Sequence, residues 1–311
     1  MTPAARLPEL GFGAAQLGNI FRVTTDEEAR GAVDAAWEGG LRMFDTAPHY
    51  GVGTSERRLG ALLRDRPRDE YVLSTKVGRL LVPGPGTGDD MAHEFAVPDD
   101  LVRRWDMSEK GVRASHEQSL ERLGLDRVDV LYLHDPEEGP VDQGIEEALP
   151  ALAAMREEGL ISHVGVGSKN ADVLTRAVRT GLLDVVMLSG RYTLLEQPAA
   201  AELLPACLEH DVQVVAVSVF NSGILSRPEV PQDSHYEYGQ APTEMLERAR
   251  ELAALAVRHG VELPDLALQF PRRHPAIGSV VLGMRTGAQV RQNLERFHRE
   301  IPAALWEELG A

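Results

Sequence analysis

The feature that most constrains this chain is a regular alternation of short apolar runs with amphipathic segments along its whole length. Apolar runs of four to eight residues indicate buried strands. In the segments between them the apolar residues recur at helical spacing and many segments end at a glycine, which indicates helices. We expect strands at 10–13, 41–45, 71–75, 128–133, 163–166, 184–188, 213–217 and 279–282. We expect helices at 25–37, 54–64, 108–123, 142–158, 171–179, 198–210, 243–259, 264–271 and 286–296. Eight strand and helix units predict an α/β fold, a single (β/α)8 TIM barrel.

A doubly wound open sheet is the alternative arrangement of the same elements. Such a sheet usually carries a G-x-G-x-x-G turn at the start of a helix, but Gly11-Phe12-Gly13 lacks the third glycine. No Gly/Ser-rich linker divides the chain into halves. We therefore expect one barrel domain over residues 1–311, with long connections after the third and seventh strands.

Charge and cysteine content exclude several classes of partner. The chain has 32 Lys and Arg against 48 Asp and Glu, so its net charge is −16. Nucleic acids and anionic membrane surfaces need clustered positive charge, and neither is expected as a partner. Cys207 is the one cysteine, and no apolar run reaches membrane-spanning length. We expect a soluble cytoplasmic protein, as a monomer or a small homo-oligomer, that acts on a small molecule.

Four polar residues follow or end three successive strands. Asp45 ends the second strand, Lys76 ends the third and His134 follows the fourth, while Tyr50 lies on the loop after the second. Each of these residues alone could have an ordinary structural role, such as capping a helix or placing a charge in solvent. In a barrel, however, the carboxyl ends of the strands form the face that carries active sites. We call these four residues the rim cluster and expect them to converge.

The residue types of the rim cluster suit proton transfer. A tyrosine has a reference pKa of about 10, and a lysine ammonium beside it favours the phenolate. A carboxylate such as Asp45 keeps that lysine charged, and a histidine can orient a substrate oxygen. These side chains can give a proton to, or take one from, a substrate oxygen whose attached carbon gains or loses hydride. Since no side chain supplies hydride, the pattern implies a nicotinamide cofactor.

At these residues the sequence resembles the aldo-keto reductase superfamily. The matching stretches are FDTAPHYGVGTSERRLG at 44–60, STKVGR at 74–79, DVLYLHDPE at 129–137, HVGVGS at 163–168 and VVLGMRTGAQVRQN at 280–293. The resemblance implies that Asp45, Tyr50, Lys76 and His134 are catalytic. It also implies NAD or NADP bound across a (β/α)8 barrel without a Rossmann motif. Within the superfamily, LSGRYTLLEQ at 188–197 and FNSGIL at 220–225 resemble the branch of D-threo-aldose (L-fucose) 1-dehydrogenases.

The same resemblance implies a set of cofactor contacts. NADPH-dependent relatives hold the 2′-phosphate with basic residues where this chain has Gly283 and Gln289, so NAD is slightly favoured over NADP. Arg285 lies between these positions and can serve in part. The implied cofactor-binding residues are Gly13, Ala14, Asp45, Ser168, Ser189, Ser218, Phe220, Asn221, Gly223, Leu225, Gly283, Arg285, Gln289 and Asn293.

The two long connections, 78–107 and 220–242, are expected to shape the substrate pocket, because loops of this length in a compact domain are usually functional or disordered. Aromatic and hydrogen-bonding groups suit a sugar ring. The expected substrate contacts are His49, Tyr50, Trp105, His134 and Tyr236.

The leading hypothesis is oxidation of an aldose at its anomeric carbon to the lactone. An NADPH-dependent aldehyde or ketone reductase and a pyridoxal 4-dehydrogenase are the alternatives within the same chemistry. From other classes, a metal-dependent hydrolase using His49, His134, Asp45 and Asp135 and a cofactor-binding regulatory subunit remain open. No metal site is expected, since no H-x-H pair marks the first strand.

Overall fold

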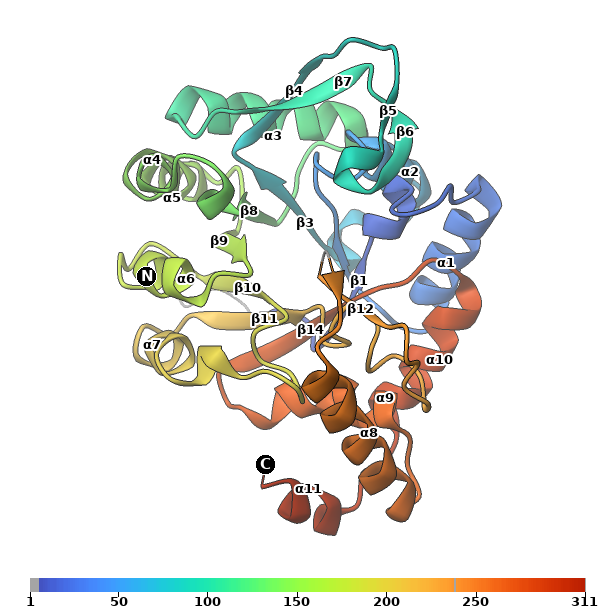
Figure 1. Ribbon diagram of the computed structural model, residues 1–311. Helices are drawn as coiled ribbons and strands as arrows, with labels where there is room; N and C mark the ends of the chain where they lie inside the picture. Colours follow the sequence, from blue (N-terminus) through green and yellow to red (C-terminus); the bar gives the residue numbers. More distant parts are fainter. Residues whose placement is uncertain (1–5, 238, 311) are drawn as a thin grey trace.

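Eight parallel strands close into a barrel in a computed structural model that describes residues 6–237 and 239–310 (Figure 1). The ends of the expected domain, residues 1–5 and 311, lie outside this description. Around the ring the order is β1-β14-β11-β10-β9-β8-β3-β2. The strands are β1 (Leu10–Gly13), β2 (Met43–Asp45), β3 (Val72–Val77), β8 (Val130–His134), β9 (His163–Ser168), β10 (Val185–Ser189), β11 (Gln213–Val217) and β14 (Ile277–Gly283). The predicted (β/α)8 barrel is confirmed.

Helices follow each barrel strand and flank the ring (Figure 1). Their bounds agree with the sequence pattern to within a few residues, except that the helix expected at 142–158 contains a π-helical stretch over Gly144–Ala148. A helix close to the carboxyl end, α11, had no counterpart in the sequence pattern. The helices are α1 (Asp26–Glu38), α2 (Thr54–Leu63), α3 (Glu109–Leu123), α4 (Val141–Gln143), α5 (Leu149–Glu157), α6 (Ala171–Val178), α7 (Leu203–Glu209), α8 (Thr243–Arg258), α9 (Leu263–Gln269), α10 (Gly287–His298) and α11 (Ala303–Leu309).

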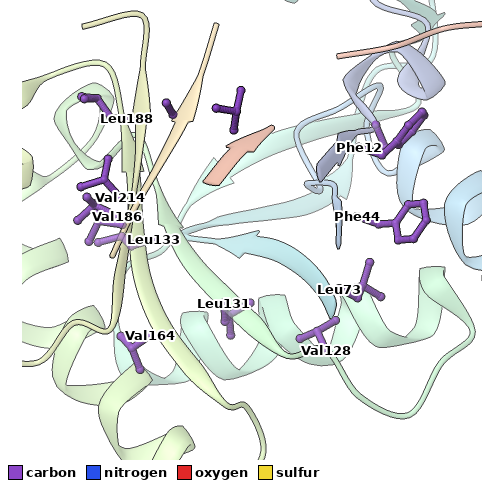
Figure 2. Packing of buried hydrophobic residues seen from close by; sticks show 14 of the residues in the cluster. Phe12, Phe44, Leu73, Val128, Leu131, Leu133, Val164, Val186, Leu188 and Val214 are labelled. Carbon is purple, nitrogen blue, oxygen red and sulfur yellow. The ribbon is translucent and has the colours of Figure 1, made fainter. Parts of the chain in front are cut away.

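Strand residues alternate between two apolar layers, as the period of two requires. Phe12, Phe44 and Leu73 belong to the larger layer between the strands and the helices (Figure 2). Met43 and Tyr132 belong to a smaller cluster that fills the barrel interior. The strands are therefore buried on both faces, and polar groups gather at their carboxyl ends.

The connection after β3 is ordered and folds as antiparallel pairs. Strands β4 (Arg79–Pro83) and β7 (Leu101–Trp105) pair with each other, and β5 (Asp89–Asp90) pairs with β6 (Phe95–Pro98) inside that hairpin. We call residues 79–105 the hairpin insertion. The connection after β11 contains a smaller pair, β12 (His235–Tyr236) with β13 (Gly239–Gln240).

The start of α2 differs from the sequence expectation. Ser and Thr commonly cap helices, but Gly53 occupies the N-cap of α2 and no side chain caps it. The Ser55 hydroxyl instead donates to the Ala14 carbonyl at 2.7 Å, so a tertiary partner has replaced the local one. This bond ties α2 to the segment that follows β1.

Candidate active site

The rim cluster converges on one cavity of about 540 Å³ at the carboxyl ends of β2, β3 and β8. These strands are neighbours in the barrel, and their register pairs Asp45 with Ser74 and Lys76 with Tyr132. All four rim-cluster side chains line this space, which we call the main cavity. The predicted convergence is thus observed.

Lys76 and Asp45 form a buried ion pair beneath Tyr50. Lys76 Nζ lies 2.7 Å and 3.0 Å from the two Asp45 carboxylate oxygens and also donates to the Thr46 carbonyl at 2.9 Å. The Ser74 hydroxyl donates to Asp45 at 2.7 Å. Burial opposes the lysine charge, but Asp45 and Tyr50 outweigh it and raise the pKa of Lys76 to about 12. Lys76 is therefore a fixed cation at neutral pH.

Tyr50 stands directly over this cation. Lys76 Nζ lies 4.7 Å from the centre of the Tyr50 ring. Burial raises the pKa of Tyr50, and the Lys76 ammonium acts in the opposite direction. The free protein consequently holds Tyr50 as a neutral phenol, with a charge beside it that eases proton loss.

Close backbone packing fixes the Tyr50 loop. Gly51 has a φ of +60°, and a Cβ added to it would lie 2.1 Å from the Gly18 carbonyl oxygen. A Cβ added to Gly18 would in turn lie 2.6 Å from the Tyr50 carbonyl. Only glycine fits such an approach, and the 3₁₀ turn Ala15–Gly18 thus sets the position of Tyr50.

His134 and His49 are neutral imidazoles. Burial, followed by the nearby arginines and Lys76, holds the pKa of His134 well below its ordinary value. Burial, followed by Arg103 and Arg79, lowers the pKa of His49 to about 2. The His134 ring lies 6.0 Å from the Tyr50 ring, and its Nε2 lies 3.2 Å from Asp135 Oδ2. A neutral ring facing a carboxylate in this way carries its proton on Nε2.

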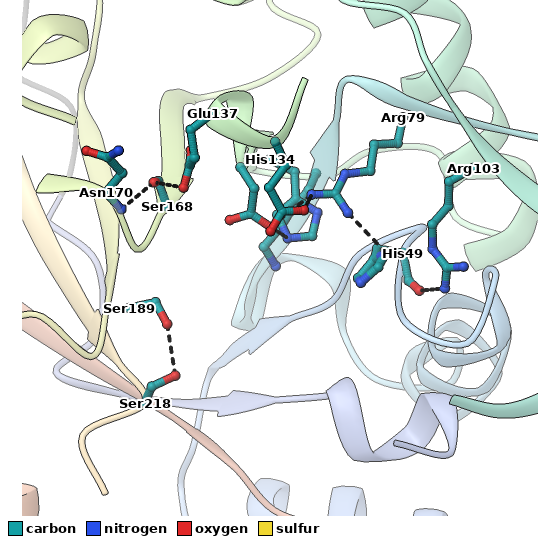
Figure 3. A network of polar contacts seen from close by, with 12 residues as sticks. His49, Arg79, Arg103, His134, Glu137, Ser168, Asn170, Ser189 and Ser218 are labelled. Atoms are coloured by element: carbon teal, nitrogen blue, oxygen red, sulfur yellow. Dashed lines mark hydrogen bonds and ion pairs between the residues drawn. The ribbon is translucent and has the colours of Figure 1, made fainter. Parts of the chain in front are cut away.

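Two arginines of the hairpin insertion hold His49 from both sides, as Figure 3 shows. Arg79 Nη1 lies 3.2 Å from His49 Nδ1, and Arg103 donates to the His49 carbonyl at 2.7 Å. Asp90 pairs with Arg103 at 2.6 Å. Neither arginine is among the site residues expected from the sequence. Arg79 stands in the quoted STKVGR stretch, but its partners are distant in sequence and no local pattern indicates them.

The main cavity extends from the rim cluster across the carboxyl ends of β9, β10, β11 and β14. Ser189 and Ser218 hydroxyls lie 3.0 Å apart on its wall (Figure 3). The Ser168 hydroxyl also lines it and donates to Glu137 at 2.5 Å. The expected cofactor-binding residues on its wall are Gly13, Asp45, Ser168, Ser189, Ser218, Phe220, Asn221, Gly223 and Gly283.

The turn after β11 suits a nicotinamide cofactor. Ser218, Asn221, Ser222 and Gly223 all have positive φ, and the N–H groups of Asn221 and Gly223 close the turn on the Ser218 and Phe220 carbonyls at 3.0 Å. Asn221 is buried, and its Oδ1 has no hydrogen-bond partner among the described residues. An unpartnered acceptor on the cavity wall can receive a ligand amide or hydroxyl. The residues present therefore fit the cofactor.

Several residues expected to contact the cofactor or the substrate line neither the main cavity nor an adjoining cavity of about 760 Å³. Leu225 is fully buried in an apolar cluster, and Ala14 is fully buried with its N–H bonded to the Asp45 carbonyl at 2.8 Å. Arg285 donates to the Ile20 carbonyl at 2.6 Å, which directs its guanidinium into the protein. The others are Trp105, whose ring stacks on Arg79 at 4.3 Å, Gln289, which caps α10, and Asn293 on α10.

Tyr236 lines the adjoining cavity of about 760 Å³ instead of the main one. Its hydroxyl contacts Glu196 and accepts from Arg191 at 2.8 Å, which ties the β12–β13 pair to the loop after β10. Tyr236 therefore faces a space beside the rim cluster, and its contact with substrate stays a prediction.

No group of three or more His, Cys, Asp or Glu side chains is placed to hold a metal ion in the described part of the chain. The metal-dependent reading gains no support, because Asp45 is bonded to Lys76. Among residues 6–237 and 239–310, no helix has both the length and the apolarity needed to cross a bilayer.

Comparison with known proteins agrees with this geometry. The model of the Aldo/keto reductase family matches residues 9–311. The chain belongs to this family. A D-threo-aldose 1-dehydrogenase from a Pseudomonas species is 53% identical over 98% of the chain and 93% of its own length. A pyridoxal 4-dehydrogenase from Microbacterium luteolum is 34% identical over 96% of the chain and 92% of its own length.

A solved structure extends the comparison to three dimensions. An aldo-keto reductase from Bacillus halodurans, in its holo form, has a TM-score of 0.75 at 25% identity and covers 99% of this chain and 96% of its own. As a member of the family, the chain is an NAD(P)-dependent oxidoreductase acting on CH–OH groups.

Proposed function

We propose that the protein is an aldose 1-dehydrogenase, which oxidises the anomeric carbon of a sugar of the L-fucose or D-threo-aldose type to the lactone. The observation that carries the chemistry is the buried Asp45–Lys76 pair beneath Tyr50 at the floor of the main cavity. The relative at 53% identity supports the substrate class.

In this proposal Tyr50 is the general acid and base. A nicotinamide held against the wall of the main cavity would supply the acceptor for the hydride at C1 of the sugar. As the C1–H bond breaks, the anomeric hydroxyl gives its proton to Tyr50 Oη, and the C1–O bond becomes the lactone carbonyl. Lys76 stabilises the phenolate form of Tyr50 that takes the proton, and Asp45 keeps Lys76 charged and in position.

His134 orients the sugar hydroxyl. In this proposal the Nε2–H of the neutral imidazole, which faces Asp135 Oδ2 at 3.2 Å in the free protein, turns to the substrate oxygen and adds no second positive charge beside Lys76. The His134 and Tyr50 rings meet edge to face with their centres 6.0 Å apart, so both side chains can reach the same substrate oxygen. His49, held by Arg79 and Arg103, forms the adjoining wall.

The cofactor would lie across β9, β10, β11 and β14, held by Ser168, Ser189, Ser218 and the turn at Asn221. NAD is favoured over NADP, because Gly283 and Gln289 carry no charge and Arg285 is directed toward backbone carbonyls. A free cation for a 2′-phosphate is what NADP recognition requires.

A substrate panel tests the proposal. Initial rates of oxidation of L-fucose, other aldoses and pyridoxal are followed at the nicotinamide absorbance with NAD and with NADP, and reduction of a generic aldehyde is followed with NADH and with NADPH. We expect the highest kcat/KM with an aldose and NAD. Faster turnover of pyridoxal, or of an aldehyde with NADPH, would select one of the alternative substrates. Nicotinamide binding without turnover of any compound would indicate a regulatory subunit.

Tyr50→Phe tests the mechanism. The substitution removes one hydroxyl and keeps the ring over Lys76. Because general acid and base catalysis contributes roughly 10²–10⁴-fold, kcat should fall by about that factor while the Kd for NAD changes little. Normal turnover in this variant would defeat the assignment of Tyr50.

A further inference from the structure

We propose that Asp135 is a specificity-determining residue of the main cavity, whose carboxylate accepts hydrogen bonds from the ring hydroxyls of a polyhydroxylated substrate. This inference rests on the proposed function, since it names the feature by which the site would distinguish a sugar. Proton transfer by the rim cluster requires no second carboxylate beside Tyr50 and His134, yet Asp135 lines the same cavity.

The backbone places Asp135 at the cavity at a conformational cost. Its φ is +42°, in the left-handed region that few residues other than glycine adopt. Its N–H donates to the Gly167 carbonyl at 2.8 Å, and its carbonyl accepts from Glu138 at 3.0 Å. Strain of this kind persists where the surrounding structure holds it, and it concentrates at functional sites.

The carboxylate of Asp135 is only half used by the protein. Arg79 Nη2 at 3.0 Å and His134 Nε2 at 3.2 Å both contact Oδ2. Oδ1 accepts none of the hydrogen bonds found among the described residues, and the side chain is 26% exposed. A carboxylate has about four acceptor positions, so Oδ1 can accept from a ligand in the cavity. Burial raises the pKa of Asp135 to about 6 and the Arg79 charge opposes this rise, so the carboxyl is ionised at neutral pH.

The lining of the main cavity, which Asp135 shares, suits a sugar more than a simple aldehyde. Ile20 and Phe21 line the same cavity and offer apolar surface to the C–H face of a ring. Hydroxyl groups at the ring edge can then satisfy Oδ1 through charge-assisted bonds, which are about twice as strong as neutral ones. A substrate without hydroxyls would leave Oδ1 unpaired. A site that hydrogen-bonds a substrate hydroxyl discriminates strongly against the analogue lacking it.

The test pairs protein variants with substrate analogues. Asp135→Asn and Asp135→Ser are compared with wild type on L-fucose and its monodeoxy analogues. Glu138→Gln is the matched control, because Glu138 contacts the same Arg79 Nη2 at 3.1 Å but does not line the main cavity. Melting temperature and the Kd for NAD establish that each variant is folded.

We expect Asp135→Asn to raise KM for L-fucose at least tenfold with a smaller change in kcat, and Glu138→Gln to change KM less than threefold. With wild type, at least one monodeoxy analogue should have a kcat/KM tenfold below that of L-fucose, because its missing hydroxyl is the one that Asp135 binds. Asp135→Asn should not lower kcat/KM for that analogue any further. Asp135→Ser should show the same pattern.

Two other outcomes separate this inference from the proposed function. If, for every analogue, the loss in kcat/KM from Asp135→Asn multiplies with the loss from the missing hydroxyl, Asp135 does not recognise hydroxyls and this inference alone is overturned. The same conclusion follows if Asp135→Asn strongly lowers kcat while KM stays constant. If the wild-type protein oxidises no aldose with either cofactor, the proposed function falls and the inference falls with it.

Discussion

Removing Lys76 should damage stability and catalysis in separable ways. Lys76 and Asp45 side chains are 2% and 5% exposed, so water cannot solvate a carboxylate left behind by Lys76→Met. Breaking a buried pair from one side costs about 3–5 kcal/mol, whereas replacing both partners is often nearly neutral. We therefore expect Lys76→Met to lower the free energy of unfolding by about that amount.

The double variant Lys76→Met/Asp45→Asn should recover most of this loss. In the double variant the amide at position 45 carries no charge. Its oxygen can still accept a hydrogen bond from the Ser74 hydroxyl, which donates to Asp45 at 2.7 Å in the wild-type protein. We expect the double variant to unfold within about 1–2 kcal/mol of wild type. Both variants should lose roughly 10²–10⁴-fold in kcat, because neither has a cation beside Tyr50.

The assay is urea unfolding followed by circular dichroism and by tryptophan fluorescence, together with turnover at saturating aldose and NAD. Asp45→Asn alone completes the thermodynamic cycle and yields the coupling energy of the pair. A double variant as unstable as Lys76→Met would refute the reasoning, since the loss could not then come from an uncompensated carboxylate. Turnover restored in the double variant would refute the role given to the cation.

Three further predictions concern the same site. Gly18→Ala should lower kcat by about 10–100-fold, because its Cβ would lie 2.6 Å from the Tyr50 carbonyl and displace that loop, whereas Gly31→Ala, with nothing within 4 Å, should not. The rate of aldose oxidation should rise from pH 7 toward pH 10, since burial raises the pKa of Tyr50 and the base form must be populated; a flat profile measured with saturating NAD would contradict this. Burial raises the pKa of Asp135 from 3.8 to about 6, so its ionised form destabilises the fold above pH 6 and not below pH 4. Urea unfolding at pH 8 should show Asp135→Asn more stable than wild type by about 1–3 kcal/mol, and an equal advantage at pH 4 would contradict this origin.

The barrel and the rim cluster could be predicted because both depend on local signals. Strand ends are marked by Pro48, Gly78 and Pro136, and the carboxyl ends of parallel strands meet on one face of a barrel. Asp45, Lys76 and His134 therefore converge whatever the loops do. No detail of side-chain packing was needed to place them.

Loop contacts could not be predicted in the same way. Ser55 reads as a helix cap, but its hydroxyl finds the Ala14 carbonyl, a partner 41 residues away. Arg285 reads as a phosphate contact, but carbonyls near residue 20 attract its guanidinium. Arg79 joins His49 to Asp135, although these partners lie 30 and 56 residues from it in the sequence. In each case a nonlocal partner decides the orientation, and sequence spacing carries no information about it.

The transfer of deuterium from L-fucose labelled at C1 tests the central claim most directly. Incubation with the protein and NAD, followed by mass spectrometry of the nicotinamide and the sugar product, reports which bond breaks. We predict one deuterium in the reduced cofactor, an unlabelled lactone and a slower rate than with unlabelled sugar. Reduced cofactor without deuterium, or no reduction by any aldose, would contradict hydride transfer from the anomeric carbon.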